Sequence, residues 1–366
     1  MKIKAAVART VSGNFSIEDV DLADPRDEEL LVKIVATGIC HTDLSVVSQI
    51  LPLPLPQVLG HEGAGIVERV GSDVKGIEPG DHVVLSFNYC GGCAPCTAQH
   101  LAYCDQYWFL NFNAGSTDGS ATHKDANGER LGGAFLSQSS FATYALTHQR
   151  NTIKVRKDAP LELLGPLGCG LTTGAGTVLN VLKPGPETTI AIFGTGAIGM
   201  SALLAARNLD AGRIIAVDRV ESRLELALEL GATEVVNTAE QDLAAALEAV
   251  GGIDQGIEST GVPPVISTAA DALKVRGTLA LLGLSNVPQV TLNILPLISG
   301  KTIRGVAHGD CNPSVLIPQL VDSYLEGKFP MDRLSAFYPF EQINKAVADT
   351  NSGKTIKPIL RMESEH

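Results

Sequence analysis

The chain has 366 residues, more than one hydrophobic core usually serves, so two domains are expected. Its composition, 45% hydrophobic and 19% charged, excludes a disordered or fibrous protein, and its net charge of −12 argues against nucleic acid or an anionic membrane as a partner. Because it lacks a signal-peptide pattern and any apolar run of membrane-spanning length, we expect a soluble cytoplasmic protein.

The first part of the chain, to about residue 157, predicts a mostly antiparallel β domain. Short runs rich in β-branched residues at 30–38, 64–74 and 80–87 are separated by glycine and proline. That texture is typical of short strands joined by turns.

Four of the seven cysteines lie within fifteen residues, at Cys90, Cys93, Cys96 and Cys104. In a reducing compartment such clusters bind metal more often than they form disulfides, and four thiolates suit a closed tetrahedral zinc site. A redox pair and an iron–sulfur cluster are the alternatives, but no electron-transfer motif accompanies the cluster. We therefore expect a structural zinc lobe at about residues 88–106.

The segment 105–140 is long, polar and rich in glycine. Loops of this length are usually functional or disordered. Its aromatic start, at residues 107–112, indicates that at least one end is packed.

Residues 171–308 alternate strand and helix patterns, with helices expected at 197–209 and 221–231. Apolar strands are expected at 189–194, 213–218, 234–237, 256–260, 278–283 and 302–306. This alternation predicts an α/β fold with a doubly wound, six-stranded parallel sheet. The tail, with a helix expected within 313–329, is assigned to the first domain. The expected domains are therefore 1–170 with 309–366, and 171–308.

A dinucleotide fingerprint follows the first of these strands, with glycines at Gly194, Gly196 and Gly199. Glycines there allow a tight turn and close approach of a pyrophosphate to a helix N-terminus. Asp218 ends the next strand, where a carboxylate accepts hydrogen bonds from ribose hydroxyls and repels a 2′-phosphate. NAD is therefore expected, although the neighbouring Arg219 keeps NADP open.

Cys40, His61 and Cys169 lie in glycine-rich surroundings and suggest a second metal site. Two sulfurs and one imidazole suit a catalytic zinc that keeps a fourth position for water or substrate. Taken singly, each residue could be an ordinary core residue. Their coexistence beside a nucleotide fingerprint favours the metal.

The motifs "GICHTD", "GHEGAG", "GPLGCG" with "TTGAGT", "GTGAIG" and the four-cysteine lobe together resemble the zinc-dependent medium-chain alcohol dehydrogenases over essentially the full chain. The stretches "CHTDL", "PLPQVLGHEG" and "SQSSFATYA" are most similar to the bacterial aryl and allylic members, which act on benzyl alcohol or geraniol. The resemblance implies a GroES-like catalytic domain, a Rossmann domain and an active site between them.

The resemblance also implies roles for further residues. Glu62 would be able to approach the catalytic zinc, and Asp43 would orient His61 by a hydrogen bond. The expected cofactor contacts are His41 and Lys357 at the pyrophosphate, Thr173 near the nicotinamide and Arg223 beside the adenosine ribose. With both metal sites filled, the chain would carry two zinc ions.

The expected chemistry is oxidation of an alcohol. Zinc would make the alcohol hydroxyl more acidic, and the nicotinamide ring would accept hydride from its carbon. Thr42 is expected to take the proton toward the cofactor ribose. Many family members continue this relay with a histidine where this chain has Ser45, so the outer relay is expected to use ribose and water.

The expected activity is reversible, NAD-dependent oxidation of a primary aryl or allylic alcohol to the aldehyde. Candidate residues for an apolar substrate wall are Phe87, Trp108, Phe109, Phe112 and Phe141, although core packing is an equal alternative. Other activities remain open: an aliphatic, polyol or glutathione-adduct dehydrogenase, a zinc-free quinone or enoyl reductase, or a non-catalytic NAD- and zinc-binding protein. The family resemblance implies a homodimer or homotetramer.

Overall fold

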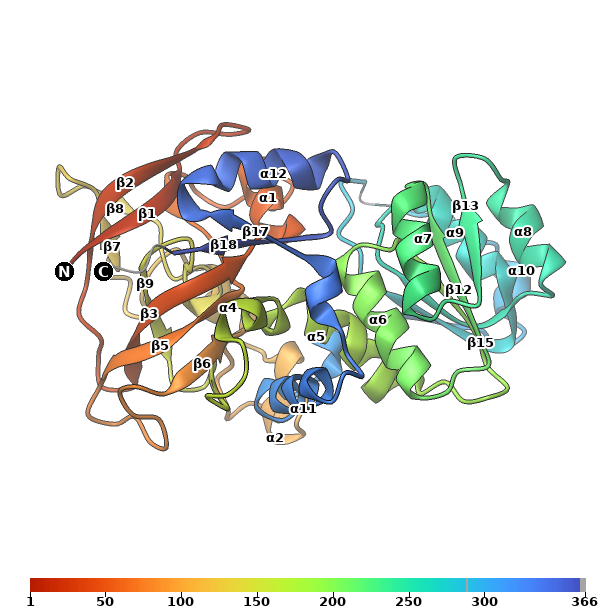
Figure 1. Cartoon of the computed structure of the whole chain (residues 1–366), viewed down its shortest axis with the longest axis horizontal. Helices are drawn as coiled ribbons and strands as arrows, with labels where there is room; N and C mark the ends of the chain where they lie inside the picture. The colour runs from red at the N-terminus through yellow and green to blue at the C-terminus, as the bar shows by residue number, and fades with distance from the viewer. Residues whose placement is uncertain (288, 363–366) are drawn as a thin grey trace. The chain divides into compact units, whose positions relative to one another are not determined.

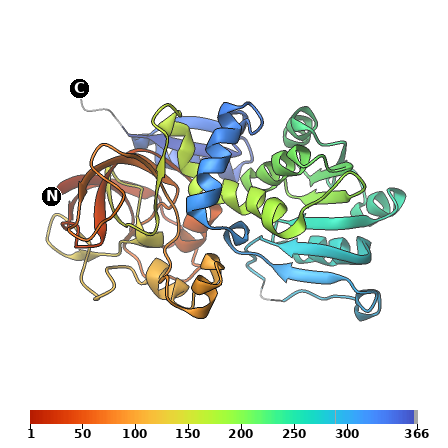
Figure 2. The same cartoon turned by 90° about the horizontal axis from the view of Figure 1, so that it is seen from below.

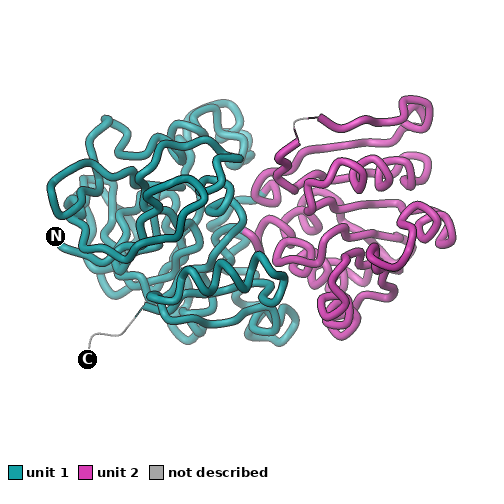
Figure 3. Tube along the Cα trace, turned by 90° about the horizontal axis from the view of Figure 1, so that it is seen from above, with its two compact units in different colours: residues 1–169, 311–366 teal, residues 170–310 magenta. Residues whose placement is uncertain are grey.

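The computed structural model describes residues 1–287 and 289–362. The chain forms two compact units, one from residues 1–169 with the chain from 311 onward, the other from residues 170–310 (Figure 3). Within the described residues, no helix combines the length and apolar character needed to cross a membrane.

Unit 1 is built mainly from β-strands (Figure 1). Its strands are β1 Lys2–Ala8, β2 Phe15–Leu22, β3 Glu29–Gly38, β4 Gln57–Val58, β5 Gly63–Val70, β6 His82–Leu85, β7 His123–Lys124, β8 Arg130–Leu131, β9 Tyr144–His148, β10 Thr152–Val155, β17 Ser335–Pro339 and β18 Lys357–Arg361. Its helices are α1 His41–Val47, α2 Ala94–Thr97, α3 Tyr107–Phe112, α4 Leu161–Leu164, α11 Pro313–Leu325 and α12 Ile343–Asn351.

These strands form two sheets, ordered β4-β1-β2-β7-β8 and β10-β6-β5-β3-β18-β17, with β9 also paired to β3. All pairs between these strands are antiparallel except β17 with β18. Along parts of β1 and β2, buried and exposed residues alternate, so one face of these strands packs inward and the other faces solvent. The C-terminal strand completes the larger sheet, because Ile359 of β18 pairs with Gly38 of β3. The tail thus belongs to the same sheet as the first strands.

Unit 2 confirms the expected doubly wound sheet (Figure 2). Its strands are β11 Thr189–Phe193, β12 Arg213–Asp218, β13 Glu234–Asn237, β14 Ile253–Glu258, β15 Leu273–Leu281 and β16 Thr302–Gly305. They lie in the order β13-β12-β11-β14-β15-β16, and every neighbouring pair is parallel. The order reverses between β11 and β14, and such a reversal opens a crevice at the carboxyl ends of the strands.

Helices cover both faces of this sheet: α6 Ala197–Asn208, α7 Glu221–Leu230, α8 Leu243–Ala249 and α9 Pro263–Ala272. Unit 2 also contains α5 Gly170–Gly176, which packs on α6, and α10 Ile294–Leu297. Because crossovers between parallel strands are right-handed, α6 and α7 lie on one face and α8 and α9 on the other. The contacts agree, since α6 packs on α7 and α8 packs on α9. Strand residues such as Phe193 and Val217 form the core with Leu247 of α8.

The segment 105–140 is not one long loop. It contains α3 and the short β7–β8 hairpin, and it then passes through four non-glycine residues with left-handed backbone: Ala134 (φ 56°), Leu136 (φ 47°), Ser137 (φ 54°) and Ser139 (φ 50°). Left-handed backbone costs energy in residues with a side chain, so surrounding contacts must hold it. Such strain concentrates at functional sites.

Candidate active site and metal centres

Four potential ligand atoms converge in unit 1, from Cys40, His61, Glu62 and Cys169, and all lie within 4.8 Å of one another. Cys40 immediately precedes α1, and Cys169 immediately precedes α5. His61 and Glu62 stand between β4 and β5. The fold thus brings together residues that are far apart in the sequence.

Asp43 connects two of these ligands. Its carboxylate accepts hydrogen bonds from the backbone N–H of Cys40 at 3.0 Å and of Gly60 at 3.0 Å, and its Oδ1 lies 2.9 Å from Nδ1 of His61. Asp43 and His61 are both buried. A carboxylate on Nδ1 fixes the ring orientation and leaves Nε2 as the atom available to a metal.

The donor set fits a zinc ion. Nε2 of His61 is buried and has no hydrogen-bond partner. Burying an unpaired polar atom costs free energy unless a bound ligand or metal interacts with that atom. A hydrogen bond from Cys169 and the positive charges of His61 and Lys357 lower the pKa of Cys40 well below its ordinary value, against burial. The same hydrogen bond and burial raise the pKa of Cys169. Because a metal binds cysteine as the thiolate, its binding here would release the protons of these sulfurs.

Lys357, the residue expected at the cofactor pyrophosphate, forms an ion pair in this structure. Its ammonium lies 2.9 Å and 2.8 Å from the two carboxylate oxygens of Glu62 and donates to the carbonyl of Ile39 at 3.1 Å. Lys357 is 3% exposed, and Glu62 is 0% exposed. A buried carboxylate needs hydrogen-bond donors or a counter-charge, and Lys357 supplies both to Glu62, so the ion pair holds the lysine inside the unit.

The ionisation of this pair depends on both partners. Burial lowers the pKa of Lys357, but the charge of Glu62 outweighs it and holds the pKa at about 12. Burial raises the pKa of Glu62 to about 7, and the charge of Lys357 opposes that rise. Glu62 therefore lies beside the other three ligands with its charge balanced by Lys357.

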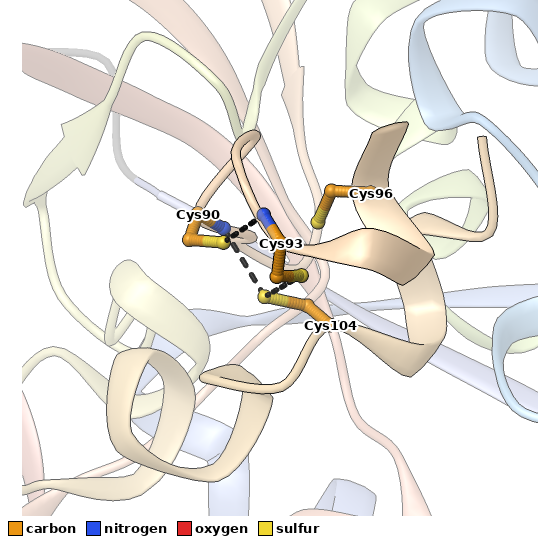
Figure 4. A group of neighbouring side chains, drawn as sticks. All are labelled: Cys90, Cys93, Cys96 and Cys104. Carbon is orange, nitrogen blue, oxygen red and sulfur yellow. Dashed lines mark hydrogen bonds between the residues drawn. The ribbon is translucent and has the colours of Figure 1, made fainter. Parts of the chain in front are cut away.

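The four cysteines of the predicted lobe form a second cluster (Figure 4). Their sulfurs lie within 4.8 Å of one another, and none is in a disulfide. Backbone N–H groups of Gly92 and Cys93 point at Cys90 and lower its pKa to about 6, whereas burial raises the pKa of Cys96 to about 12. A four-sulfur set of this kind fits a closed tetrahedral zinc site.

In unit 2, the predicted fingerprint forms the turn between β11 and α6. Gly194 has a left-handed backbone (φ +89°). A Cβ on Gly199 would lie 1.8 Å from the carbonyl oxygen of Gly194, whereas a Cβ on Gly196 would meet nothing within 4 Å. Helix α6 therefore packs tightly on the turn and leaves open space at its own N-terminus. That arrangement suits a pyrophosphate.

Asp218 ends β12 beside this turn. One carboxylate oxygen accepts from the backbone N–H of Thr195 at 2.7 Å and from its hydroxyl at 2.9 Å; the other accepts from the N–H of Arg219 at 2.7 Å. Arg223, in the first turn of α7, has a buried Nε atom with no hydrogen-bond partner. The oriented carboxylate and the unpartnered guanidinium atom both fit a bound nucleotide.

The other expected contact residues differ in exposure. His41 is exposed at the start of α1, and Thr173 is buried within α5. Thr42 is half-buried, with its hydroxyl 3.8 Å from the sulfur of Cys40. Ser45 is buried on α1.

The predicted aromatic residues separate into two groups. Trp108 and Phe109 of α3 are 65% and 50% exposed, and Trp108 stacks on Phe112 with ring centroids 4.9 Å apart. Phe141, by contrast, is buried in the core against Phe15. Phe87 is buried against Tyr89 and Tyr107.

Comparison with known proteins places this geometry in a family. Residues 26–157 match the alcohol dehydrogenase GroES-like domain, and residues 197–323 match the zinc-binding dehydrogenase family. Geraniol dehydrogenase from Castellaniella defragrans is 44% identical over 364 residues, which cover 98% of this chain and 97% of that protein. The chain belongs to the zinc-dependent alcohol dehydrogenases.

Solved structures agree with this family. The benzyl alcohol dehydrogenase of Acinetobacter calcoaceticus is 46% identical, with a TM-score of 0.95 over 99% of this chain and 100% of that one. An alcohol dehydrogenase zinc-binding domain protein from Burkholderia ambifaria is 52% identical, with a TM-score of 0.97 over 100% of both chains. A zinc-binding dehydrogenase from Sinorhizobium meliloti 1021, solved with NADP, is 26% identical, with a TM-score of 0.79 over 99% of both chains. The zinc-binding dehydrogenase match agrees with the two clusters of potential zinc ligands in this alcohol dehydrogenase.

Two residues that support the centre of this alcohol dehydrogenase were not predicted from the sequence. Phe135 packs edge-on against the ring of His61 at 5.4 Å and against Phe112 at 5.7 Å. Gln138 is buried; its amide oxygen accepts from the N–H of Gly63 at 3.1 Å, and its amide nitrogen donates to the carbonyls of His61 at 3.1 Å and Ser86 at 3.3 Å. Both belong to the segment with left-handed backbone, which the sequence "AFLSQSS" does not reveal.

Proposed function

We propose that the enzyme reversibly oxidises a primary aryl or allylic alcohol to the aldehyde, with NAD as the hydride acceptor. The observation that carries the proposal is the convergence of Cys40, His61 and Cys169 around the unpartnered Nε2 atom. The names of the geraniol and benzyl alcohol dehydrogenases support the substrate class.

In this mechanism, Cys40, His61 and Cys169 would hold a zinc ion, and the Cys90–Cys104 lobe would hold a second, structural one. When bound, zinc polarises the oxygen of an alcohol or aldehyde, and the nicotinamide cofactor exchanges hydride with its carbon. Asp43 keeps the His61 ring in the ligating orientation through its 2.9 Å contact with Nδ1. Lys357 offsets the Glu62 charge beside the ligands, so the centre keeps its electrophilic character.

Thr42 is the proposed first acceptor of the alcohol proton. Its hydroxyl lies 3.8 Å from the Cys40 sulfur and can both accept and donate a hydrogen bond. Ser45 is buried and its hydroxyl does not act as an acid or base near neutral pH, so it cannot replace the relay histidine of other family members. Beyond Thr42, the relay would depend on the cofactor ribose and water.

The aromatic residues near His61 support a flat, conjugated substrate. Rings lie in sequence from exposed Trp108 through Phe112 and Phe135 to His61, at centroid distances of 4.9, 5.7 and 5.4 Å. Aromatic surfaces of this kind favour planar apolar groups. Phe87 and Phe141, which are fully buried, are better explained as core residues.

NAD is proposed over NADP because the Asp218 carboxylate would repel a 2′-phosphate. The NADP-bound relative makes NADP the alternative. Asp218→Ser should raise the Michaelis constant for NAD at least about tenfold and change that for NADP much less. Equal values for NAD in the variant and the wild type would remove this assignment.

Self-association is proposed through unit 2. Within the described residues, β16 is an edge strand that pairs only with β15. Near it, Val275, Ile294, Leu295 and Ile298 are between 72% and 79% exposed. Unpaired strand edges and clustered apolar residues favour association with a second copy. Sedimentation velocity should detect a homodimer or homotetramer. Ile294→Lys should dissociate it, whereas Val11→Lys, at an exposed residue of unit 1, should not.

A substrate panel tests the activity. Benzyl alcohol and geraniol should give the highest kcat/KM with NAD, above aliphatic alcohols, polyols and the hydroxymethyl adduct of glutathione. Preference for one of these other classes would replace the proposed substrate. Absence of turnover with every alcohol, together with retained zinc and NADH binding, would instead favour a non-catalytic protein.

A further inference from the structure

A buried carboxylate stands at the carboxyl end of β14 in unit 2. Glu258 is 0% exposed, and no basic side chain of the described residues pairs with it. Its donors come from the loop that follows: the N–H of Thr260 at 2.8 Å, the Thr260 hydroxyl, and the N–H of Gly261 at 3.1 Å and 3.2 Å from the two oxygens. A buried charge is costly, so these donors hold both the carboxylate and the loop.

The same residue joins this loop to the one after β15. The backbone carbonyl of Glu258 accepts from the N–H of Leu282 at 2.8 Å and of Gly283 at 3.1 Å. The two loops touch closely, since a Cβ on Gly283 would lie 2.2 Å from the nitrogen of Gly261. Glycine is therefore required at both Gly261 and Gly283, where the loop after β14 crosses the loop after β15.

On its other side, the loop contacts the dinucleotide fingerprint. The Ser259 hydroxyl donates to the carbonyls of Phe193 at 2.9 Å and Gly194 at 3.2 Å. A Cβ on Gly194 would lie 2.8 Å from that hydroxyl oxygen and 3.0 Å from a methyl carbon of Thr260. The loop held by Glu258 is thus the immediate neighbour of the phosphate-binding turn.

The position of these loops relates them to the cofactor. A dinucleotide spans the crevice where the strand order reverses, which here is between β11 and β14. With the adenosine ribose at Asp218 on the β12 side, the nicotinamide half must extend over the ends of β14 and β15. We propose that Glu258 is a positioning residue, which preforms residues 259–261 as the support for the nicotinamide half. This inference rests on the proposed cofactor site.

Replacement of Glu258 by glutamine tests the role of the carboxylate. The amide keeps the size of the side chain, but its NH₂ group cannot accept. In place of Oε2 it would oppose the N–H of Gly261, and in place of Oε1 it would oppose the N–H groups of Thr260 and Gly261, so either orientation sets donor against donor. The loop should relax where the nicotinamide half binds, and the adenosine side at Asp218 should be unaffected.

The experiment compares two ligands on the zinc-loaded enzyme. NADH affinity is measured by fluorescence titration, and AMP affinity by calorimetry. We expect Glu258→Gln to weaken NADH binding by about tenfold or more and AMP binding by less than about twofold. The matched control is Asp254→Asn on the same strand, where the carboxylate accepts from the N–H of Thr189 at 2.8 Å and from Lys274 at 3.0 Å. It should lower the melting temperature without changing either affinity.

Thr260→Val is a second variant, which removes one donor and leaves Glu258 in place. Thr260→Val should also weaken NADH binding, by a smaller factor than Glu258→Gln. If Glu258→Gln does not fold, the proposal is tested with Thr260→Val alone. Unchanged NADH affinity, or equal losses for NADH and AMP, would overturn the positioning role. A wild-type enzyme that binds neither ligand would instead refute the proposed cofactor site, and the inference with it.

Discussion

The Nζ atom of Lys357 lies 2.9 Å and 2.8 Å from the two carboxylate oxygens of Glu62, and both side chains are buried in unit 1. The two residues are 295 positions apart in the sequence. This ion pair places a balanced charge beside three metal ligands. Because Lys357 begins β18, the ion pair also places this C-terminal strand directly beside the metal centre.

Lys357→Met should destabilise the enzyme. Removing one partner leaves the Glu62 carboxylate buried without a counter-charge, which costs about 3–5 kcal/mol. Urea unfolding of the zinc-loaded enzyme should measure this loss, and Lys357→Met with Glu62→Leu should recover most of it. Lys2→Met, at an exposed ion pair with Asp21, should change the unfolding free energy by less than about 1 kcal/mol. An unchanged stability with a raised Michaelis constant for NAD would contradict this structural role and would instead support the cofactor contact expected from the sequence.

The two proposed metal sites should respond differently to loss of a sulfur. Metal analysis should find two zinc ions per chain in the wild type and one in each of Cys40→Ser and Cys96→Ser. Cys40→Ser should abolish turnover with little change in melting temperature. Cys96→Ser should lower the melting temperature, because a structural zinc contributes folding free energy. Two zinc ions retained in Cys40→Ser would show that the metal is held elsewhere.

Gln138→Leu should weaken metal binding at the His61 centre without removing a ligand. Gln138 holds the backbone of His61 and Gly63 through two 3.1 Å hydrogen bonds, and loss of such supporting contacts typically costs 10–100-fold in metal affinity. Competition with a chelator should detect this loss. Gln57→Leu is the matched control: Gln57 is equally buried, but both of its amide atoms lack partners, so the change should be neutral or stabilising. Equal effects of the two substitutions would contradict a specific role for Gln138.

His123 should make the enzyme sensitive to mild acid. Burial lowers its pKa to about 4, from 6.5 in the unfolded chain. The neutral ring therefore contributes stability fully above about pH 6.5, and this contribution is lost as the pH falls toward 4, because only the unfolded chain then binds the proton. Between pH 7 and pH 5 the loss is about 2 kcal/mol. His123→Asn keeps a polar atom for the Thr122 hydroxyl but does not titrate, so its unfolding free energy should fall less over this range. Parallel curves for variant and wild type would argue against the buried neutral ring.

The sequence predicted the parts of the molecule that depend on local pattern. The strands of unit 2 alternate with amphipathic helices, so the six-stranded sheet and its glycine turn at Gly194 could be recognised directly. The cysteines at 90–104 are close enough in sequence to be read as one cluster. Cys40, His61 and Cys169 are distant from one another, but their residue types and glycine-rich surroundings are distinctive.

The parts that could not be predicted depend on long-range contacts. Nothing in the sequence around Lys357 indicates that Glu62, 295 positions away, is its partner in an ion pair. Phe135 and Gln138 reach His61 only because the backbone at Ala134 and Leu136 is left-handed, and no glycine indicates this conformation. Phe141 looks like its aromatic neighbours in the sequence, yet it packs on Phe15.

The pairing of β18 with β3 has a consequence for the order of assembly during synthesis. Unit 2 is formed by the contiguous residues 170–310, so it can fold as soon as these residues have left the ribosome. In unit 1, β3 cannot pair with β18 until residues 357–361 have been translated. The same holds for the ion pair of Glu62 with Lys357. A chain that stalls before this strand therefore lacks both the pairing partner of β3 and the counter-charge of Glu62.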